Sequence, residues 1–148
     1  MSALQADIEG RLAVSEPEVE VLLAEVLGAG GGSIINISSG TVLRGAPMLL
    51  HYVSSKGAVF AMTRSMATEL AADKIRVNSI IAGFTASKSV INHPMMMEKI
   101  RPHTLNARMI KRDMTPDDLC GTTVFLASSA SAFITGQAIN VDGGAITY

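Results

Sequence analysis

Two short strand-like runs on either side of a long apolar helix constrain the fold of this chain more than any other feature. Residues 33–38 read SIINIS, residues 75–81 read IRVNSII, and a helix is predicted between them over residues 51–72. The first run is nearly continuously apolar, which is typical of a strand covered on both faces in a parallel sheet. The order strand, helix, strand therefore predicts parallel neighbours joined by a right-handed crossover.

Three further elements extend this pattern. A helix is predicted over residues 17–28, where Ser15 can cap the first turn and Glu18 can reach back to it. A second helix is predicted over residues 115–127, capped by its leading threonine, and a last strand over residues 137–141. We expect an α/β fold, a parallel sheet of about three strands with flanking helices.

The 148 residues are predicted to form a single domain, residues 1–148. Residues 1–14 carry no strong pattern. Residues 84–114 are predicted to be an irregular, variable loop, and so long a stretch is usually functional or mobile. Its basic residues are expected to be solvated loop charges: Lys99, Arg101, Arg108, Lys111 and Arg112. Cys120 is expected to be a small core residue.

A glycine-rich run at residues 28–32 invites a dinucleotide-binding interpretation, which we reject. A phosphate-binding turn needs a strand before it and a helix after it, so that amides at the helix N-terminus meet the phosphates. Here the predicted order is helix first and strand second, so the glycines are interpreted as a helix-to-strand turn.

Composition excludes several classes of function. Hydrophobic residues make up 48% of the chain and charged residues 17%, with a formal net charge of −1, so neither disorder nor a nucleic-acid surface is expected. The first residues resemble neither a secretory signal nor a membrane span. A single cysteine permits no internal disulfide, which suits the cytoplasm, and the three histidines are too scattered for a metal site.

Tyr52 and Lys56 are the strongest candidates for chemistry. They lie four residues apart on the helix predicted over residues 51–72, so both side chains project from one face. Ser39 lies upstream, at the end of a predicted strand. A neighbouring ammonium group favours the phenolate, which lets a tyrosine exchange a proton nearer neutral pH. The spacing alone is weak evidence, because it occurs by chance in many helices.

Several segments together resemble a known family. These segments are GSIINISS at residues 32–39, YVSSK at 52–56, RVNSI at 76–80 and ITGQAINVDGG at 134–144. In this order and spacing they look like the C-terminal half of a short-chain dehydrogenase/reductase, with a match over residues 17–87 and 113–145. The resemblance implies a partial Rossmann-like parallel sheet that lacks the N-terminal half of the fold.

The resemblance implies catalytic roles for three residues and no metal. Tyr52 would donate or accept the proton, Lys56 would activate it and hold the nicotinamide ribose, and Ser39 would hydrogen-bond the substrate oxygen. Ser38 would be a structural neighbour. The implied reaction is hydride transfer between NAD or NADP and an alcohol or ketone, with the charge on oxygen stabilised where it forms.

The resemblance also implies cofactor contacts beyond Tyr52 and Lys56. Gly83 matches the glycine near the nicotinamide, and Thr85 and Ser87 match positions that contact its carboxamide or the phosphates. Ordinary loop polarity remains an alternative interpretation of Thr85 and Ser87.

The family's N-terminal half, with its phosphate turn and the residue that selects NAD or NADP, has no match in this chain. Dinucleotides bind at the switch point between two half-sheets, so we expect poor dinucleotide binding and little or no turnover. We also expect the strand at residues 33–38 to be an open edge, which invites pairing with another chain.

Two functions remain open from the sequence. The first is an NAD(P)-dependent oxidoreductase acting on a small alcohol or ketone. The second is a non-catalytic, truncated relative that serves as an oligomerisation or regulatory subunit; an unproductive gene fragment with no stable fold is a weaker third interpretation. The resemblance implies that the helices over residues 17–28 and 51–72 pack against a second subunit, so we expect a homo-oligomer, with no nucleic-acid or membrane partner.

Overall fold

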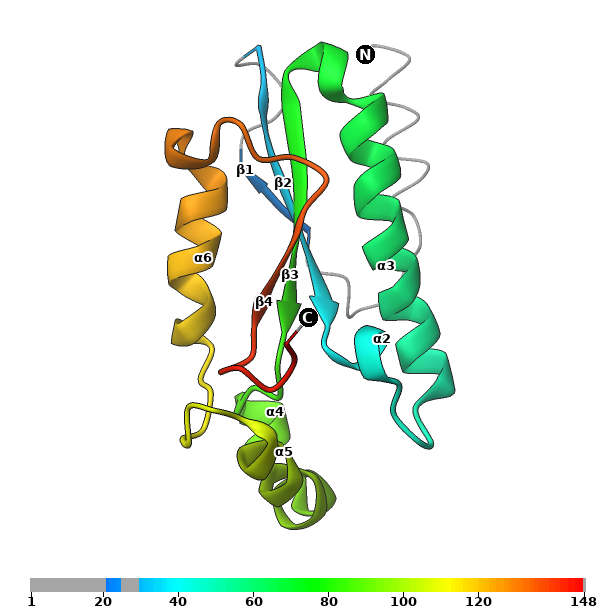
Figure 1. The fold of residues 1–148 in the computed structure, drawn as a ribbon, viewed down its shortest axis with the longest axis vertical. Coiled ribbons are helices and arrows are strands. Elements are labelled where there is room, and N and C mark those ends of the chain that lie inside the picture. Colours follow the sequence, from blue (N-terminus) through cyan, green and yellow to red (C-terminus); the bar gives the residue numbers. More distant parts are fainter. Residues whose placement is uncertain (1–20, 25–29, 148) are drawn as a thin grey trace.

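The computed structural model describes residues 21–24 and 30–147, which form a sheet between helices (Figure 1). The strand order is β1-β2-β3-β4, with bounds β1 (Val21–Ala24), β2 (Gly32–Ser39), β3 (Ile75–Ala82) and β4 (Ala138–Val141). β2, β3 and β4 are parallel, whereas β1 is antiparallel to β2. The predicted α/β fold with three parallel strands is confirmed.

Helices cover both faces of this sheet and its carboxyl edge. They are α2 (Thr41–Arg44), α3 (Leu50–Glu69), α4 (Lys88–Ile91), α5 (Arg101–Ala107) and α6 (Asp117–Ala127), with the short 3-10 helices η1 (Ala71–Asp73) and η3 (Ser129–Ser131) and the π-helix η2 (Met96–Ile100). α3 lies on one face and α6 on the other, while α4 and α5 lie beyond the carboxyl ends of the strands (Figure 1).

Side chains of β2 alternate between two separate cores. Ile34 packs with Val77 and with Ala67 of α3, whereas Ile35 packs with Ile80 and with Leu126 of α6. Successive side chains of a strand point to opposite faces of a sheet. The nearly continuous apolar run of β2 is therefore explained by burial on both faces, as predicted.

The helix predicted over residues 17–28 is wrong where the structure describes it, because residues 21–24 form β1. Val21 lies opposite Asn36 and Ala24 opposite Ser33, so β1 occupies the edge of β2 that was expected to be open. Unpaired N–H and C=O groups at a sheet edge need partners, and a short apolar segment can supply them only when it is extended, because a helix uses its own N–H and C=O groups internally. The predicted cap, Ser15 with Glu18, lies outside the described residues.

The remaining predicted elements are close to those observed. The helix predicted over residues 51–72 is α3 followed by η1, and Lys74 ends that turn with a left-handed φ of 58°. The helix predicted over residues 115–127 is α6, and the strand predicted over residues 137–141 is β4.

Residues 84–114 are not the irregular loop that was predicted, because α4, η2 and α5 lie within them. Pro102 occupies the first turn of α5, where the missing N–H of a proline removes no helical hydrogen bond. Pro102 is therefore compatible with a short helix.

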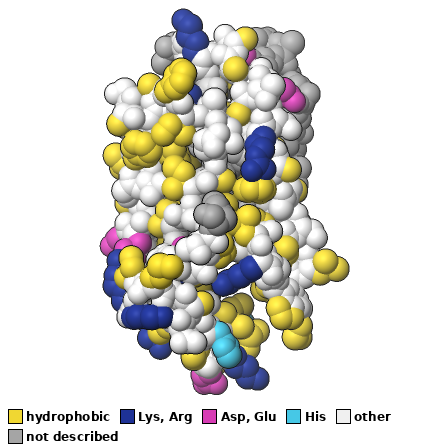
Figure 2. Space-filling view, in the orientation of Figure 1, with side chains coloured by type: hydrophobic (Ala, Val, Ile, Leu, Met, Phe, Trp, Pro, Cys, Tyr) yellow, Lys and Arg dark blue, Asp and Glu magenta, His cyan; other side chains and the backbone are white. Residues whose placement is uncertain are grey.

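Apolar side chains reach the surface over α6 (Figure 2). Val124 and Phe125 of α6 and Phe133 beyond it are exposed, and Phe133 is fully so. Cys120 of the same helix is also exposed, so its predicted place in the core is wrong. Exposed apolar patches are typical of surfaces that contact other molecules.

Candidate active site

The predicted catalytic residues lie at the carboxyl edge of the parallel sheet, where open α/β sheets bind their ligands. Ser39 is the last residue of β2, and Gly83 directly follows β3. Tyr52 and Lys56 belong to the first turns of α3, which starts near this edge. The crossover from β2 through α3 to β3 therefore brings strand ends and the start of the helix to one side of the molecule.

Tyr52 and Lys56 lie side by side, as their spacing predicts. The Lys56 ammonium nitrogen lies 5.9 Å from the centre of the Tyr52 ring, within the reach of about 6 Å that is usual for a cation and an aromatic ring. Lys56 is only 5% exposed, and its Nζ donates a hydrogen bond to the main-chain oxygen of Ile37 at 3.4 Å. The positive charge is thus held between the tyrosine and the end of β2.

Ser39 is buried at the end of β2, and its hydroxyl can still donate a hydrogen bond. Its Oγ accepts hydrogen bonds from the Thr41 N–H at 3.3 Å and from the Thr41 hydroxyl at 3.1 Å. A hydroxyl that accepts two bonds can still donate one, which is what hydrogen bonding to a substrate oxygen requires.

Ser38 links the strand directly to the helix. Its Oγ donates a hydrogen bond to the main-chain oxygen of Lys56 at 3.0 Å, and both residues are buried. This bond places the end of β2, and with it Ser39, against the turn of α3 that carries Lys56.

Gly83 is required by close packing at the end of β3. A Cβ atom there would lie 2.8 Å from the Cα of Asp142 and 2.9 Å from its Cβ, which is closer than such atoms approach. The Gly83 N–H also donates to the main-chain oxygen of Val141 at 2.9 Å. The loops after β3 and β4 therefore meet at Gly83.

The two hydroxyls predicted to contact the cofactor have partners inside their own loop. Thr85 Oγ1 donates to the main-chain oxygen of Gly83 at 3.0 Å, and the Ser87 hydroxyl shares a hydrogen bond with that of Ser89 at 3.0 Å. Ser87 also precedes the first residue of α4. Both contacts agree with the alternative interpretation, in which these residues stabilise the loop.

Arg108 was predicted to be a solvated loop charge, and this prediction is wrong. It is 3% exposed, and its guanidinium donates to the main-chain oxygens of Phe84 and Arg112, the latter at 3.0 Å. Burial lowers the pKa of Arg108 from its ordinary value. No local pattern distinguishes Arg108 from the exposed cations around it, because its carbonyl partners lie in two different loops.

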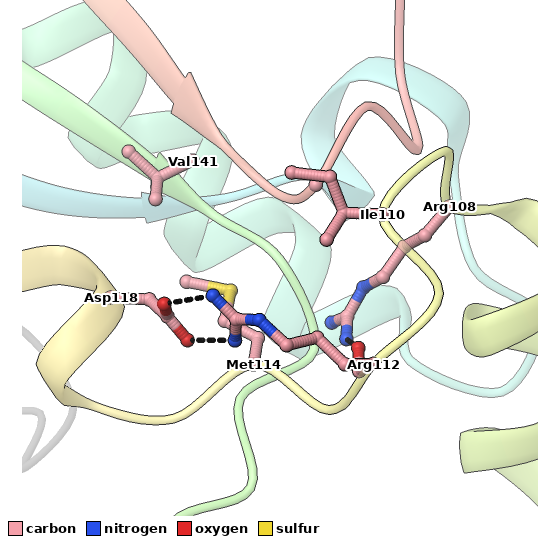
Figure 3. A pocket seen from close by; sticks show the side chains of 7 residues that line it. Arg108, Ile110, Arg112, Met114, Asp118 and Val141 are labelled. Atoms are coloured by element: carbon pink, nitrogen blue, oxygen red, sulfur yellow. Dashed lines mark hydrogen bonds and ion pairs between the residues drawn. The ribbon is translucent and has the colours of Figure 1, made fainter.

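A cavity of about 220 Å³ lies beside this site (Figure 3). Its lining residues are Arg108, Ile110, Arg112, Met114, Asp118, Val141 and Gly143. Across it the Arg112 guanidinium pairs with the Asp118 carboxylate at 2.7 Å, and this hydrogen bond lowers the pKa of Asp118 well below its usual range. Ser39, Tyr52 and Lys56 do not line this cavity.

Neither a metal site nor a membrane helix is found in the part of the chain that the structure describes. No three His, Cys, Asp or Glu side chains there are grouped so as to hold a metal ion. No helix among those residues has the length and apolar character needed to cross a bilayer.

Comparison with known proteins decides the family. A family model described as Enoyl-(Acyl carrier protein) reductase matches residues 18–146. The chain belongs to the short-chain dehydrogenase/reductase family. The membership that the sequence segments predicted is confirmed, and with it the resemblance to oxidoreductases.

Three members of the family illustrate the match. The 3-oxoacyl-(acyl-carrier-protein) reductase of Thermotoga maritima is 37% identical over 115 residues, which cover 78% of this chain and 46% of that protein. The inactive 2-(S)-hydroxypropyl-CoM dehydrogenase 2 of Xanthobacter autotrophicus is 36% identical over 117 residues, covering 76% and 50%. The structure of a short-chain type dehydrogenase/reductase from Mycobacterium ulcerans has a TM-score of 0.73 and 33% identity, covering 78% and 42%. The chain therefore spans about half the length of the curated relatives it matches.

Proposed function

We propose that this chain carries the proton-transfer residues of an NAD(P)-dependent oxidoreductase that moves a hydride between a nicotinamide and an alcohol or ketone. The observation that carries the proposal is the placement of the Lys56 ammonium 5.9 Å from the Tyr52 ring, at the end of the strand that carries Ser39. A buried cation beside a phenol, next to a hydroxyl donor, suits general acid–base chemistry on a carbonyl oxygen.

Each of the three side chains has one role in this proposal. Tyr52 gives a proton to the substrate oxygen during reduction and takes it back during oxidation. Lys56 stabilises the phenolate that remains, and Ser39 donates its hydrogen bond to the same substrate oxygen. A bound nicotinamide supplies or accepts the hydride.

The described residues fit the nicotinamide–ribose end of such a cofactor. Lys56 would hold ribose hydroxyls through its ammonium, and Gly83 allows the loops after β3 and β4 to meet without a side chain between them. We place Tyr52, Lys56 and Gly83 at this end of the cofactor, and Thr85 and Ser87 would join them only by exchanging their present hydrogen-bond partners, Gly83 and Ser89, for the cofactor. Residues 84–114 would cover the substrate, within a single domain of residues 1–148.

The test is binding of reduced nicotinamide mononucleotide, NADH and NADPH, followed by saturation-transfer NMR, together with ketone reduction followed at 340 nm. We expect the mononucleotide to bind and Lys56→Met to abolish that binding, because the ammonium is lost. Lys74→Met, an exposed lysine beyond η1, is the matched control and should bind as the wild type does.

Tyr52→Phe should keep mononucleotide binding. Any turnover should fall by about 10²–10⁴-fold, because the proton donor is removed. A wild-type chain that binds none of the three nucleotides would contradict the proposal.

A second candidate is a non-catalytic subunit, and one comparison favours it. A relative that is 36% identical is itself described as inactive, so the family includes members without turnover. In either case we propose a homo-oligomer formed through α3. Leu50, Ser54, Ala58, Ala61 and Ser65 are exposed and fall on one helical face. The part of residues 17–28 that forms β1 cannot contribute the helix that was expected there.

A further inference from the structure

A seam of buried polar side chains lies between β2 and α3. Asn36 and Ser38 of β2 and Thr63 of α3 are each no more than 2% exposed. On β2 these residues continue the same face as Ile34, so the seam follows directly from the apolar core between the sheet and α3.

Besides the bond from Lys56 Nζ to the Ile37 main-chain oxygen, two contacts join β2 to α3 along the seam. Ser38 Oγ donates to the main-chain oxygen of Lys56 at 3.0 Å. Asn36 Nδ2 donates to Thr63 Oγ1 at 3.0 Å, and Thr63 Oγ1 donates in turn to the main-chain oxygen of Val59 at 2.8 Å. Lys56 and Thr63 are about two helical turns apart, so the seam holds α3 at two separate positions along the helix axis.

Apolar packing alone would leave the placement of α3 loosely defined. Apolar residues occur all round this helix, and the hydrophobic effect has no direction. A hydrogen bond has both a direction and a length, so each seam contact fixes how one turn of α3 is rotated about the helix axis and where it lies along that axis.

The seam is not built for stability alone. In the described part of the chain, Asn36 Oδ1 and the opposing Ser79 Oγ are buried without a hydrogen-bond partner, which is costly. In some proteins, buried polar groups are retained because they fix the arrangement of packed elements.

We infer that Ser38 is a positioning residue, which holds the Lys56 turn of α3 against the end of β2 and so keeps the ammonium beside Tyr52. Its hydroxyl reaches the backbone of the residue whose side chain meets the tyrosine ring. The Asn36–Thr63 contact, by contrast, holds the helix two turns away from that pair. The catalytic meaning of this placement rests on the proposed function, whereas the placement itself does not.

The test is the rate at which Lys56 is modified by reductive methylation of the folded chain, measured by peptide mass spectrometry. The exposed lysines Lys74, Lys88, Lys99 and Lys111 are internal references, and wild-type Lys56 should react more slowly than any of them. We expect Ser38→Ala to speed the modification of Lys56 between about three- and tenfold, as expected for one lost hydrogen bond.

Thr63→Val is the matched control. It keeps the volume of the side chain but removes the acceptor of Asn36, so it should lose at least as much stability as Ser38→Ala, measured by urea unfolding. It should nevertheless leave Lys56 close to its wild-type rate. Ser38→Thr, which keeps a hydroxyl, should restore protection.

Equal Lys56 rates in Ser38→Ala and Thr63→Val would overturn the inference, because general loosening would then explain both. Failure of Ser38→Thr to restore protection would also overturn it, because the hydroxyl would not be the cause. The measurement needs neither nucleotide nor turnover, so failure of the proposed function would leave its result unaffected.

Discussion

Gly83 shows at the residue scale how packing can require the absence of a side chain. The Asp142 Cα lies 2.8 Å from the place of a Gly83 Cβ, and a backbone atom cannot rotate away as the tip of a side chain can. Gly83→Ala should therefore separate the loops after β3 and β4 and destabilise the fold by about 1–3 kcal/mol, measured by urea unfolding.

Gly121→Ala is the control for this substitution. Gly121 lies in α6, and apart from its chain neighbours and the nearby helix backbone no atom lies within 4 Å of the place that an alanine methyl group would take, so alanine should stabilise the chain by up to about 1 kcal/mol. Equal stability of Gly83→Ala and the wild type would show that the two loops can move apart without cost.

At Arg108, by contrast, a side chain is needed, because it joins segments that are far apart in the sequence. Its guanidinium joins the loop after β3, through Phe84, to the segment that leads into α6, through Arg112. Its stem lies against Gly143, where a Cβ would meet the Arg108 Cδ at 3.4 Å. One buried side chain thus contacts these three segments at the carboxyl edge of the sheet.

At the scale of elements, the start of α6 depends on Asp118. Its carboxylate accepts hydrogen bonds from Arg112 and from the Thr115 N–H. The leading threonine was expected to cap the helix with its own side chain, whereas the acid reaches back to the threonine instead. A carboxylate near a helix N-terminus also interacts favourably with the helix dipole.

These contacts predict an acid-dependent contribution to stability. The Arg112 hydrogen bond lowers the pKa of Asp118, so the folded state favours its ionised form. The stabilisation by the ionised Asp118 is therefore complete above the pKa of the unfolded state, which is about 4. It is lost as the pH falls through the lower pKa of the folded state. Wild type should exceed Asp118→Asn in stability at pH 7, and the gap should shrink steadily below pH ~4, as measured by urea unfolding.

Asp117→Asn provides the control, since it removes the same charge from the same turn of α6 without touching Arg112. Asp117→Asn should alter the loss of stability at acidic pH less than Asp118→Asn does. High salt should reduce the Asp118 effect, because the pair is exposed to solvent. A gap between wild type and Asp118→Asn that does not depend on pH would contradict the assignment.

At the scale of the whole molecule, we expect α3 to join two copies of the chain. Ala58 and Ala61 are exposed on one face of this helix, where small side chains permit close approach of a second helix. Ala61→Arg should shift the mass measured by light scattering to that of the monomer, because a buried unpaired charge is costly. Ala127→Arg, exposed on α6, should leave the mass unchanged, and a monomeric wild type would refute the expectation.

Local pattern was sufficient to predict much of the fold and the pairing of Tyr52 with Lys56. Apolar runs predict α3 and the parallel strands, because they reflect burial on more than one face, and the threonine at residue 115 marks the start of α6. A separation of four residues on a helix places two side chains together whatever surrounds them. These features depend on neighbours along the chain, so the amino-acid order is enough to reveal them.

Contacts between distant segments required the three-dimensional structure. The segment VLLA is apolar in a helix or a strand alike, and only the unpaired edge of β2 makes it β1. Burial of Arg108, exposure of Cys120 and the hydroxyl bond from Ser38 to Lys56 likewise depend on partners that no local pattern specifies. The physical reason is that hydrogen bonds and burial are decided by whichever groups meet in space, and sequence periodicity records only which face is covered.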